Sequence, residues 1–114
     1  TVMQTLNLDG FVVVTTPQEL AVVDAKRSIN MIKTLKLAVL GIVENMAGDM
    51  FGSGGGEQLA AEMGLDFLGR TQMRKDYRDT SKPASLHSKD VSKEYEHIAA
   101  RVKKALAATA DAAV

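Results

Sequence analysis

The sequence predicts an α/β protein built on a parallel sheet with flanking helices, in the order strand, helix, strand, helix, strand, helix. Two apolar runs rich in β-branched residues, at positions 11–14 and 37–43, are typical of strands covered on both faces. A helical pattern lies between them, which predicts a right-handed β–α–β unit. Because three parallel strands make a small sheet, we expect the chain to form one side of a larger, doubly wound domain.

The first helix is predicted to begin at Pro17. Thr16 stands at the N-cap position and Glu19 at the third helical position, the pattern of a capping box. Apolar residues then recur at helical spacing, at Val22, Ala25, Ile29 and Ile32. We therefore expect one face of this helix to pack on the sheet.

Residues 44–56 contain five glycines, which predicts a mobile loop. A short helix is expected over residues 57–63. Gly64 is placed to end it in the left-handed conformation, with Leu65 covering the end as in a Schellman motif. Residues 66–69 are predicted to form the third strand.

Charged residues and turn formers dominate residues 70–89, and the proline at position 83 disfavours a long helix, so we expect a loop with one helical turn. The last helix is predicted to be capped by Ser88 or Asp90. Its apolar face comprises Val91, Tyr95, Ile98, Val102 and either Ala105 or Leu106. The alanine-rich residues 107–114 are expected to fray.

The composition excludes several classes of function. At 114 residues the chain holds one domain at most, and its 14 basic residues balance 14 acidic ones, so no overall positive field attracts nucleic acid or anionic lipid. There is no cysteine, which removes disulfides and thiolate ligands. No stretch approaches the roughly 20 apolar residues of a membrane span. We expect a cytoplasmic protein that binds neither nucleic acid nor membrane, and interpret the start at Thr1 as a cut end.

The glycine run at residues 52–56 is a candidate phosphate site, because backbone N–H groups at a helix N-terminus bind anions. However, no Lys-Ser or Lys-Thr follows it, as a Walker A loop requires, and Glu57 replaces the third glycine of a dinucleotide fingerprint. A flexible linker is the favoured interpretation.

In open α/β sheets, ligands bind at the carboxyl ends of the strands. The segments that follow the three predicted strands are Thr15–Pro17, Glu44–Met46 and Arg70–Met73. Asn45 is notable because a carboxamide both donates and accepts hydrogen bonds, which suits the edge of a purine base. A loop asparagine bonded to its own backbone is nevertheless the commoner case. For Thr15 at a strand end and Thr16 at a helix cap, a structural role explains the residue at least as well as ligand binding does.

Four basic residues follow the third strand and could approach phosphates: Arg70, Arg74, Lys75 and Arg78. Since Asp76 and Asp79 are interleaved with them, a solvated surface of mixed charge is favoured. His87 and His97 lie ten residues apart and have no cysteine partners, so metal ligation has little support. We predict no catalytic residue and no metal ligand within the chain.

Several short motifs follow one another in a fixed order. They are Leu-Asp-Gly at 8–10, Val-Val-Thr-Thr-Pro-Gln-Glu at 13–19, Leu-Gly-Ile-Val-Glu-Asn-Met at 40–46, Phe-Gly and further glycines through Gly-Glu at 51–57, Phe-Leu-Gly at 67–69, Arg78, and Ser-Lys-Pro at 81–83. Together they resemble the Mrp family of P-loop ATPases, which are related to MinD and ParA. The likeness covers about residues 1–86.

The resemblance implies that residues 1–114 are the C-terminal portion of a single Mrp-type ATPase domain with a doubly wound P-loop NTPase fold. It also implies an ATP-binding homodimer that carries iron–sulfur clusters to apoprotein clients. The residues it places beside the base are Asn45, Met46, Thr71, Gln72 and Met73. Those it places near the nucleotide or the dimer interface are Thr15, Thr16, Pro17 and Glu19.

The sequence departs from the family pattern in three ways. The usual Ile-Pro-Leu-Asp-Pro-like loop is Thr71-Gln72-Met73-Arg74-Lys75 here, which changes the residues expected around the base. The Walker A lysine and the magnesium ligands of the family do not occur in the chain, so we predict no measurable ATPase activity from these 114 residues alone.

The third departure concerns the cluster. Many members carry Cys-x-x-Cys where this chain has residues 47–50, and cluster iron needs thiolates. Two interpretations stay open: a cluster carrier that works without this pair, or a MinD- or ParA-like positioning or protein-interaction module without cluster chemistry.

Overall fold

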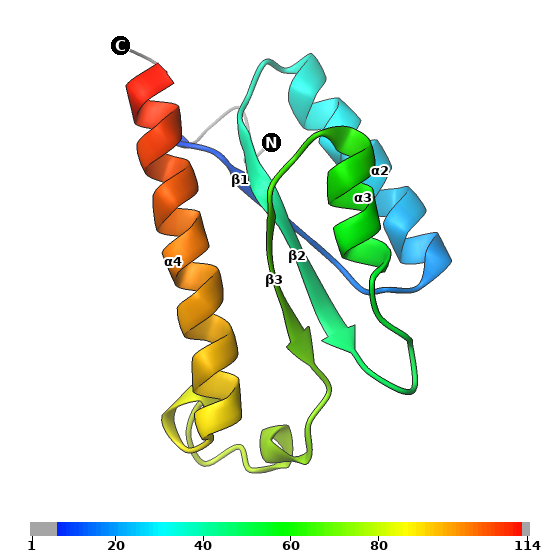
Figure 1. Ribbon diagram of the computed structural model, residues 1–114, viewed down its shortest axis with the longest axis vertical. Coiled ribbons are helices and arrows are strands. Elements are labelled where there is room, and N and C mark those ends of the chain that lie inside the picture. Colours follow the sequence, from blue (N-terminus) through cyan, green and yellow to red (C-terminus); the bar gives the residue numbers. More distant parts are fainter. Residues whose placement is uncertain (1–6, 113–114) are drawn as a thin grey trace.

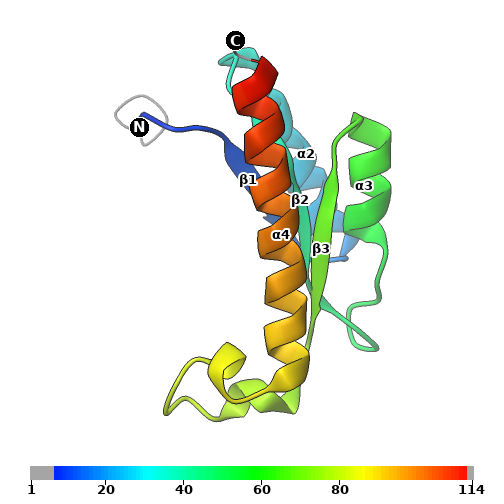
Figure 2. The ribbon, with the colours of Figure 1, turned by 60° about the vertical axis from the view of Figure 1, so that its left-hand side comes forward.

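The computed structural model describes residues 7–112, with side chains through residue 109. Three strands, β1 (Phe11–Thr15), β2 (Val39–Ala47) and β3 (Phe67–Gln72), form one parallel sheet in that order. Helices α2 (Glu19–Thr34) and α3 (Gly55–Met63) cover one face and α4 (Lys89–Ala112) covers the other (Figures 1 and 2). The predicted class and element order are confirmed.

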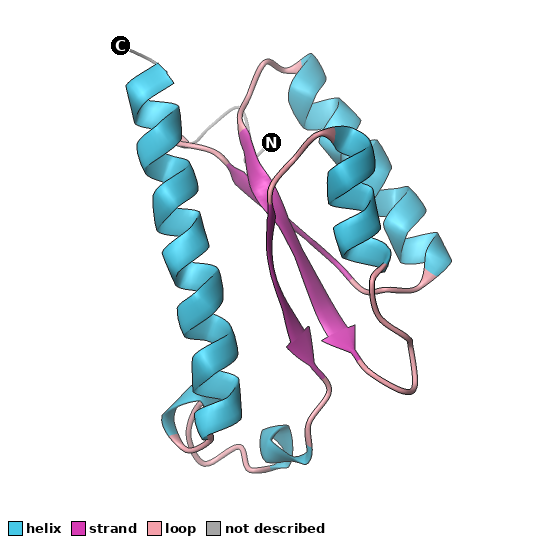
Figure 3. Cartoon of the chain, viewed as in Figure 1, coloured by secondary structure: helices cyan, strands magenta, loops and turns pink. Residues whose placement is uncertain are grey.

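The register brings the carboxyl ends of the strands to one edge of the sheet. β1 pairs with β2 from Phe11 opposite Val39 to Thr15 opposite Glu44. β2 pairs with β3 as far as Ala47 opposite Gln72. Two 3₁₀ turns, η1 (Lys75–Arg78) and η2 (Ala84–Leu86), lie beyond this edge, where Figure 3 shows the strand arrows pointing.

The core lies between the sheet and the α2–α3 layer. Its buried members are Val13, Ala25, Ile29, Ile32, Ile42, Leu59 and Ala60. Val22 packs against this cluster and is partly buried. The apolar stripe predicted for the first helix is therefore confirmed.

The predicted capping box is wrong. Helix α2 begins at Glu19, and its N-cap residue is Gln18, whose side chain makes no capping hydrogen bond. The Thr16 hydroxyl donates to Oε1 of Gln18 instead, at 3.1 Å. A tertiary contact accompanies this shift. Pro17 lies outside α2 and packs closely against Gly55 at the start of α3, where an added Cβ on Gly55 would meet the Pro17 carbonyl oxygen at 2.7 Å.

The glycine-rich segment is more ordered than predicted. Strand β2 continues through residues 44–47, and Gly48 and Gly52 then exchange two backbone hydrogen bonds of 2.9 and 2.7 Å. Helix α3 begins at Gly55, two residues before the predicted start. The predicted mobile loop over 44–56 is thus reduced to a closed turn and a short link.

The end of α3 follows the prediction. Gly64 is left-handed with φ 66°, the Leu65 N–H donates to the Ala60 carbonyl at 2.8 Å, and the Gly64 N–H donates to Ala61 at 3.3 Å. This is the bonding pattern of a Schellman motif. β3 extends to Gln72, beyond the predicted end, and the following segment contains two 3₁₀ turns where one helical turn was expected.

Helix α4 is capped by Ser88, one of the two predicted candidates. Its Oγ accepts the Val91 N–H at 3.3 Å. The helix reaches Ala112; fraying of its end stays a prediction, and residues 113–114 lie outside the described part. No helix within residues 7–112 has the length and apolar character needed to cross a membrane.

Candidate functional site

A groove of 610 Å³ opens at the carboxyl ends of β2 and β3. Four of the predicted site residues line it: Asn45, Met46, Gln72 and Met73. Its other walls come from η1 and the first turns of α4, through Arg74, Lys75, Tyr77, Arg78 and Tyr95. The groove therefore lies where ligands bind in open α/β sheets.

Asn45 is held by a neighbouring strand and not by its own backbone. The Thr71 hydroxyl donates to Asn45 Oδ1 at 2.6 Å. Among residues 7–109, no group accepts a hydrogen bond from Asn45 Nδ2, so the half-buried amide keeps its donors for a ligand. Thr71, at 3% exposed, supports Asn45 and does not line the groove.

Met46 and Met73 bring apolar surface to the groove. Met46 is in the left-handed region, with φ 59°, and is 44% exposed. The Met73 N–H donates to the Ala47 carbonyl at 3.0 Å, which joins the two strand ends. Flexible thioether side chains of this kind adapt to flat apolar surfaces such as a base.

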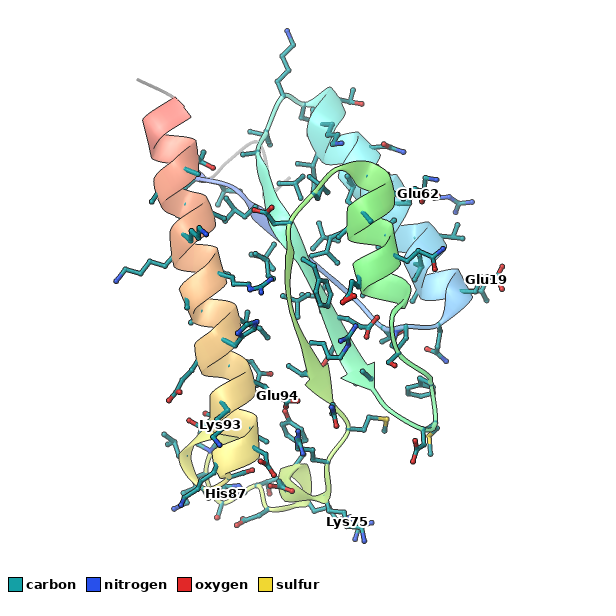
Figure 4. The ribbon with its side chains drawn as sticks, viewed as in Figure 1. Glu19, Glu62, Lys75, His87, Lys93 and Glu94 are labelled. Carbon is teal, nitrogen blue, oxygen red and sulfur yellow. The ribbon has the colours of Figure 1, made fainter. Side chains whose placement is uncertain are left out.

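The structure separates the second set of predicted residues from this groove. Thr15 is buried and donates to the Thr16 carbonyl at 2.9 Å. Pro17 and Glu19 line another groove, of 430 Å³, between α2 and α3. Figure 4 shows Glu19 at the start of α2 and Lys75 well away from it, beyond the end of β3. The two sets therefore do not share one cavity.

Glu44, the residue before Asn45, is fully buried and bound on several sides. Its carboxylate accepts the N–H groups of Gly54 at 3.0 Å and Gly56 at 2.7 Å, and the Arg70 Nε donates to it at 2.8 Å. Burial by itself raises the pKa of Glu44, but the hydrogen bonds from Arg70, Gly54 and Gly56 outweigh burial and place the pKa below its ordinary value of 4.5.

This carboxylate occupies the N-terminus of α3. The N–H groups of Gly54 and Gly56 would be the donors of a phosphate cradle, and they already bind Glu44. Their arrangement disfavours an anion site there, as the sequence suggested. The same contact explains why the glycine segment is held against the sheet.

Two of the four basic residues, Arg70 and Arg74, are paired with acids that the sequence did not suggest. Arg70 binds Glu44, and Arg74 binds Glu94 at 3.1 Å, with Asp90 3.7 Å away. The hydrogen bond to Glu94 raises the pKa of Arg74. A mixed-charge surface was predicted, but these partners come from β2 and α4 and not from the interleaved aspartates.

Sequence reasoning missed two aromatic residues of the groove. Tyr77 and Tyr95 are 39% and 47% exposed. Burial, followed by the proximity of Tyr95 and Glu94, raises the pKa of Tyr77. From the sequence, Tyr95 was assigned to the apolar face of the last helix. Its position near Ser88, at the start of that helix, is the sequence signal that could have placed it at the strand ends.

The two histidines differ in their surroundings. His97 is exposed, whereas His87 is half-buried and its Nε2 has no hydrogen-bond partner among the described residues. Within that same part of the chain, no three residues of the types His, Cys, Asp and Glu come together in a way that could hold a metal ion.

Residues 1–106 match the family model described as ParA: NUBPL iron-transfer P-loop NTPase. The chain belongs to this family. Its resemblance to the Mrp-type and MinD-related ATPases is thereby confirmed. A structural comparison agrees on the fold: the cell division ATPase MinD of Pyrococcus furiosus superposes with a TM-score of 0.67 and 22% identity, over 82% of this chain and 42% of that chain.

Curated relatives in the NUBPL family carry cluster-related names. An iron–sulfur cluster carrier protein of Methanocaldococcus jannaschii is 40% identical over 116 aligned positions, which cover 90% of this chain and 40% of that protein. The iron–sulfur cluster transfer protein NUBPL of Dictyostelium discoideum is 34% identical over 82% of this chain and 36% of its own length. The chain thus spans about two fifths of the length of these relatives.

Proposed function

We propose that this chain forms the base-binding side of an ATP site in an iron–sulfur cluster carrier. The observation that carries the proposal is the groove at the ends of β2 and β3, in which Asn45 keeps an unsatisfied amide donor beside the apolar side chains of Met46 and Met73. The names of the curated relatives support the carrier role.

In the proposed site, Asn45 Nδ2 donates to an acceptor nitrogen on the adenine edge. Thr71 holds Oδ1 on the other side and so fixes the orientation of the amide. Met46, Met73 and the two tyrosines supply apolar surface for the base. Polar groups that fix orientation within a mostly apolar lining are typical of cofactor sites.

The phosphates and magnesium would be bound elsewhere in the domain. None of the 114 residues forms a Gly-x-x-x-x-Gly-Lys-Ser/Thr loop, and Glu44 already occupies the N–H groups at the start of α3. We further propose a homodimer, with Thr15, Thr16, Pro17 and Glu19 near the partner or the nucleotide, and a cytosolic location.

The cluster is the cargo of the proposed carrier. This chain has no cysteine, so its residues do not fit a cluster held by thiolates, and we derive no step through them. Ligands for the cargo would lie outside these 114 residues. The rival function, a positioning or interaction module without cluster chemistry, is not favoured because the relatives are named as cluster carriers or assembly factors.

The direct test uses a protein that contains these residues within a complete domain. We expect it to bind ATP and, after anaerobic reconstitution with iron and sulfide, to transfer a cluster to an apoprotein. ATP binding without any cluster would favour the interaction module, and no nucleotide binding would end the proposal. The 114 residues alone are expected to show no ATP turnover.

Substituting Asn45 by alanine is expected to weaken ATP binding by about 10- to 100-fold, because an acceptor of the base that loses its donor costs roughly 1–3 kcal/mol. Asn45→Asp should be nearly as harmful, since a carboxylate still accepts from Thr71 but has no N–H to donate. Titration calorimetry measures both. Asn30→Ala, at an exposed position on α2, is the matched control and should bind as the parent does.

A further inference from the structure

Glu94 on α4 forms hydrogen bonds with the last residue of β3 and with the segment that follows it. Its Oε2 accepts the backbone N–H of Gln72 at 3.2 Å and the Arg74 Nη2 at 3.1 Å, while its Oε1 lies 3.3 Å from the Arg74 Nε. The Glu94 side chain is only 13% exposed. In Figure 4, Glu94 points from α4 toward the end of β3.

We infer that Glu94 is a positioning residue of the groove and sets its selectivity for the base. The inference rests on the proposed function. Glu94 does not line the groove, but Gln72, Met73 and Arg74 do, and Glu94 holds the first and the last of these three residues. It therefore acts on the base through other side chains.

Apart from Glu94, backbone hydrogen bonds hold the end of β3 only on the side of β2. The Met73 N–H donates inward to the Ala47 carbonyl, whereas the Gln72 N–H points to the outer edge of β3, where no strand among the described residues lies. Glu94 satisfies that outer N–H. Without Glu94, the Gln72 N–H would have no hydrogen-bond partner among the described residues.

Glu94 also neutralises the positive charge of Arg74 in the groove wall. Arg74 is 23% exposed and would otherwise present a free cation beside a bound nucleotide. Such a cation attracts the phosphates of ATP and GTP equally, because both carry the same triphosphate. The attraction to the phosphates therefore cancels in the ratio of the dissociation constants for GTP and ATP, and the ratio reports contacts with the base, including the hydrogen bonds that a freed Arg74 can donate to O6 and N7 of guanine.

The experiment measures that ratio by competition titration in a protein containing the complete domain. Glu94→Ala is expected to lower the ratio by about tenfold, because the wall that contacts the base loses its position and the freed Arg74 guanidinium can contact guanine. Glu94→Gln keeps one acceptor oxygen and should give an intermediate ratio. Asp90→Asn weakens the other contact of Arg74 but leaves the Gln72 N–H bonded, so its ratio should equal that of the parent.

The outcomes separate the two proposals. A parent protein without ATP binding contradicts the proposed function, whereas a selective parent whose Glu94→Ala variant is equally selective overturns the role of Glu94 alone. If Glu94→Ala does not fold, the Glu94→Gln ratio and amide exchange at Gln72 decide. A Gln72 amide that exchanges as fast as an unstructured one in the parent would also overturn the inference.

Discussion

Replacing Glu44 with alanine is expected to destabilise the folded protein by about 3 kcal/mol. The substitution removes the acceptor for the N–H groups of Gly54 and Gly56 and leaves the Arg70 guanidinium without its closest partner. Since Arg70 is 31% exposed, water compensates part of this loss, and the effect stays below that of a fully buried pair. Denaturant unfolding followed by circular dichroism measures it.

The matched control is another glutamate with a basic partner. Glu62 forms a surface pair with Lys26 at 3.3 Å, and Glu62→Ala should cost roughly 0.5 kcal/mol or less. If both variants lost the same free energy of unfolding, the stabilising role of the buried Glu44 contacts would be contradicted. The comparison isolates burial and backbone contacts, because both substitutions remove one carboxylate and one ion pair.

The stability that Glu44 contributes should depend on pH in one direction. Its pKa in the folded protein lies below 4.5, so on acidification the unfolded chain takes up a proton at this residue first. The contribution is complete above about pH 4.5 and decreases as the pH falls through the lower folded pKa. Glu44→Gln should lack this part of the acid sensitivity, and a parent-like acid profile in that variant would contradict the assignment.

The sequence predicted the fold well because the signals for it are local. The apolar runs of β1 and β2, the stripe on α2 and the glycine that ends α3 each depend on neighbours within a few turns or strand residues. The Ser88 cap is likewise a contact across three residues. Asn45 could be singled out because its side chain has suitable chemistry at a strand end.

The parts that could not be predicted depend on partners far apart in the chain. Glu44 meets Arg70 across 26 residues, and Glu94 meets Gln72 across 22. No spacing rule links such positions, so Glu44 was regarded as a loop residue and Arg70 as solvated. The same reason applies at Thr16, whose capping pattern was locally sound but was overridden by the contact between Pro17 and Gly55.

The second large effect is expected at Gly41, within the apolar run of β2. A Cβ at this position would meet the Asp66 carbonyl oxygen and the Leu68 Cγ, each at 2.6 Å. The same Asp66 oxygen accepts the Ile42 N–H at 2.9 Å and begins the pairing of β2 with β3. Gly41→Ala should therefore push the two strands apart and destabilise the fold by about 3 kcal/mol or more, measured by denaturant unfolding.

Gly52→Ala separates this clash from the general effect of adding a methyl group to a glycine. Gly52 has φ 81° and no atom within 4 Å of its would-be Cβ, so only backbone strain of roughly 1 kcal/mol is expected. If Gly41→Ala were no more harmful than Gly52→Ala, the close approach of β2 and β3 would be wrong. Because these two strands carry Asn45 and Gln72 at their far ends, the register begun beside Gly41 also determines whether the groove forms at all.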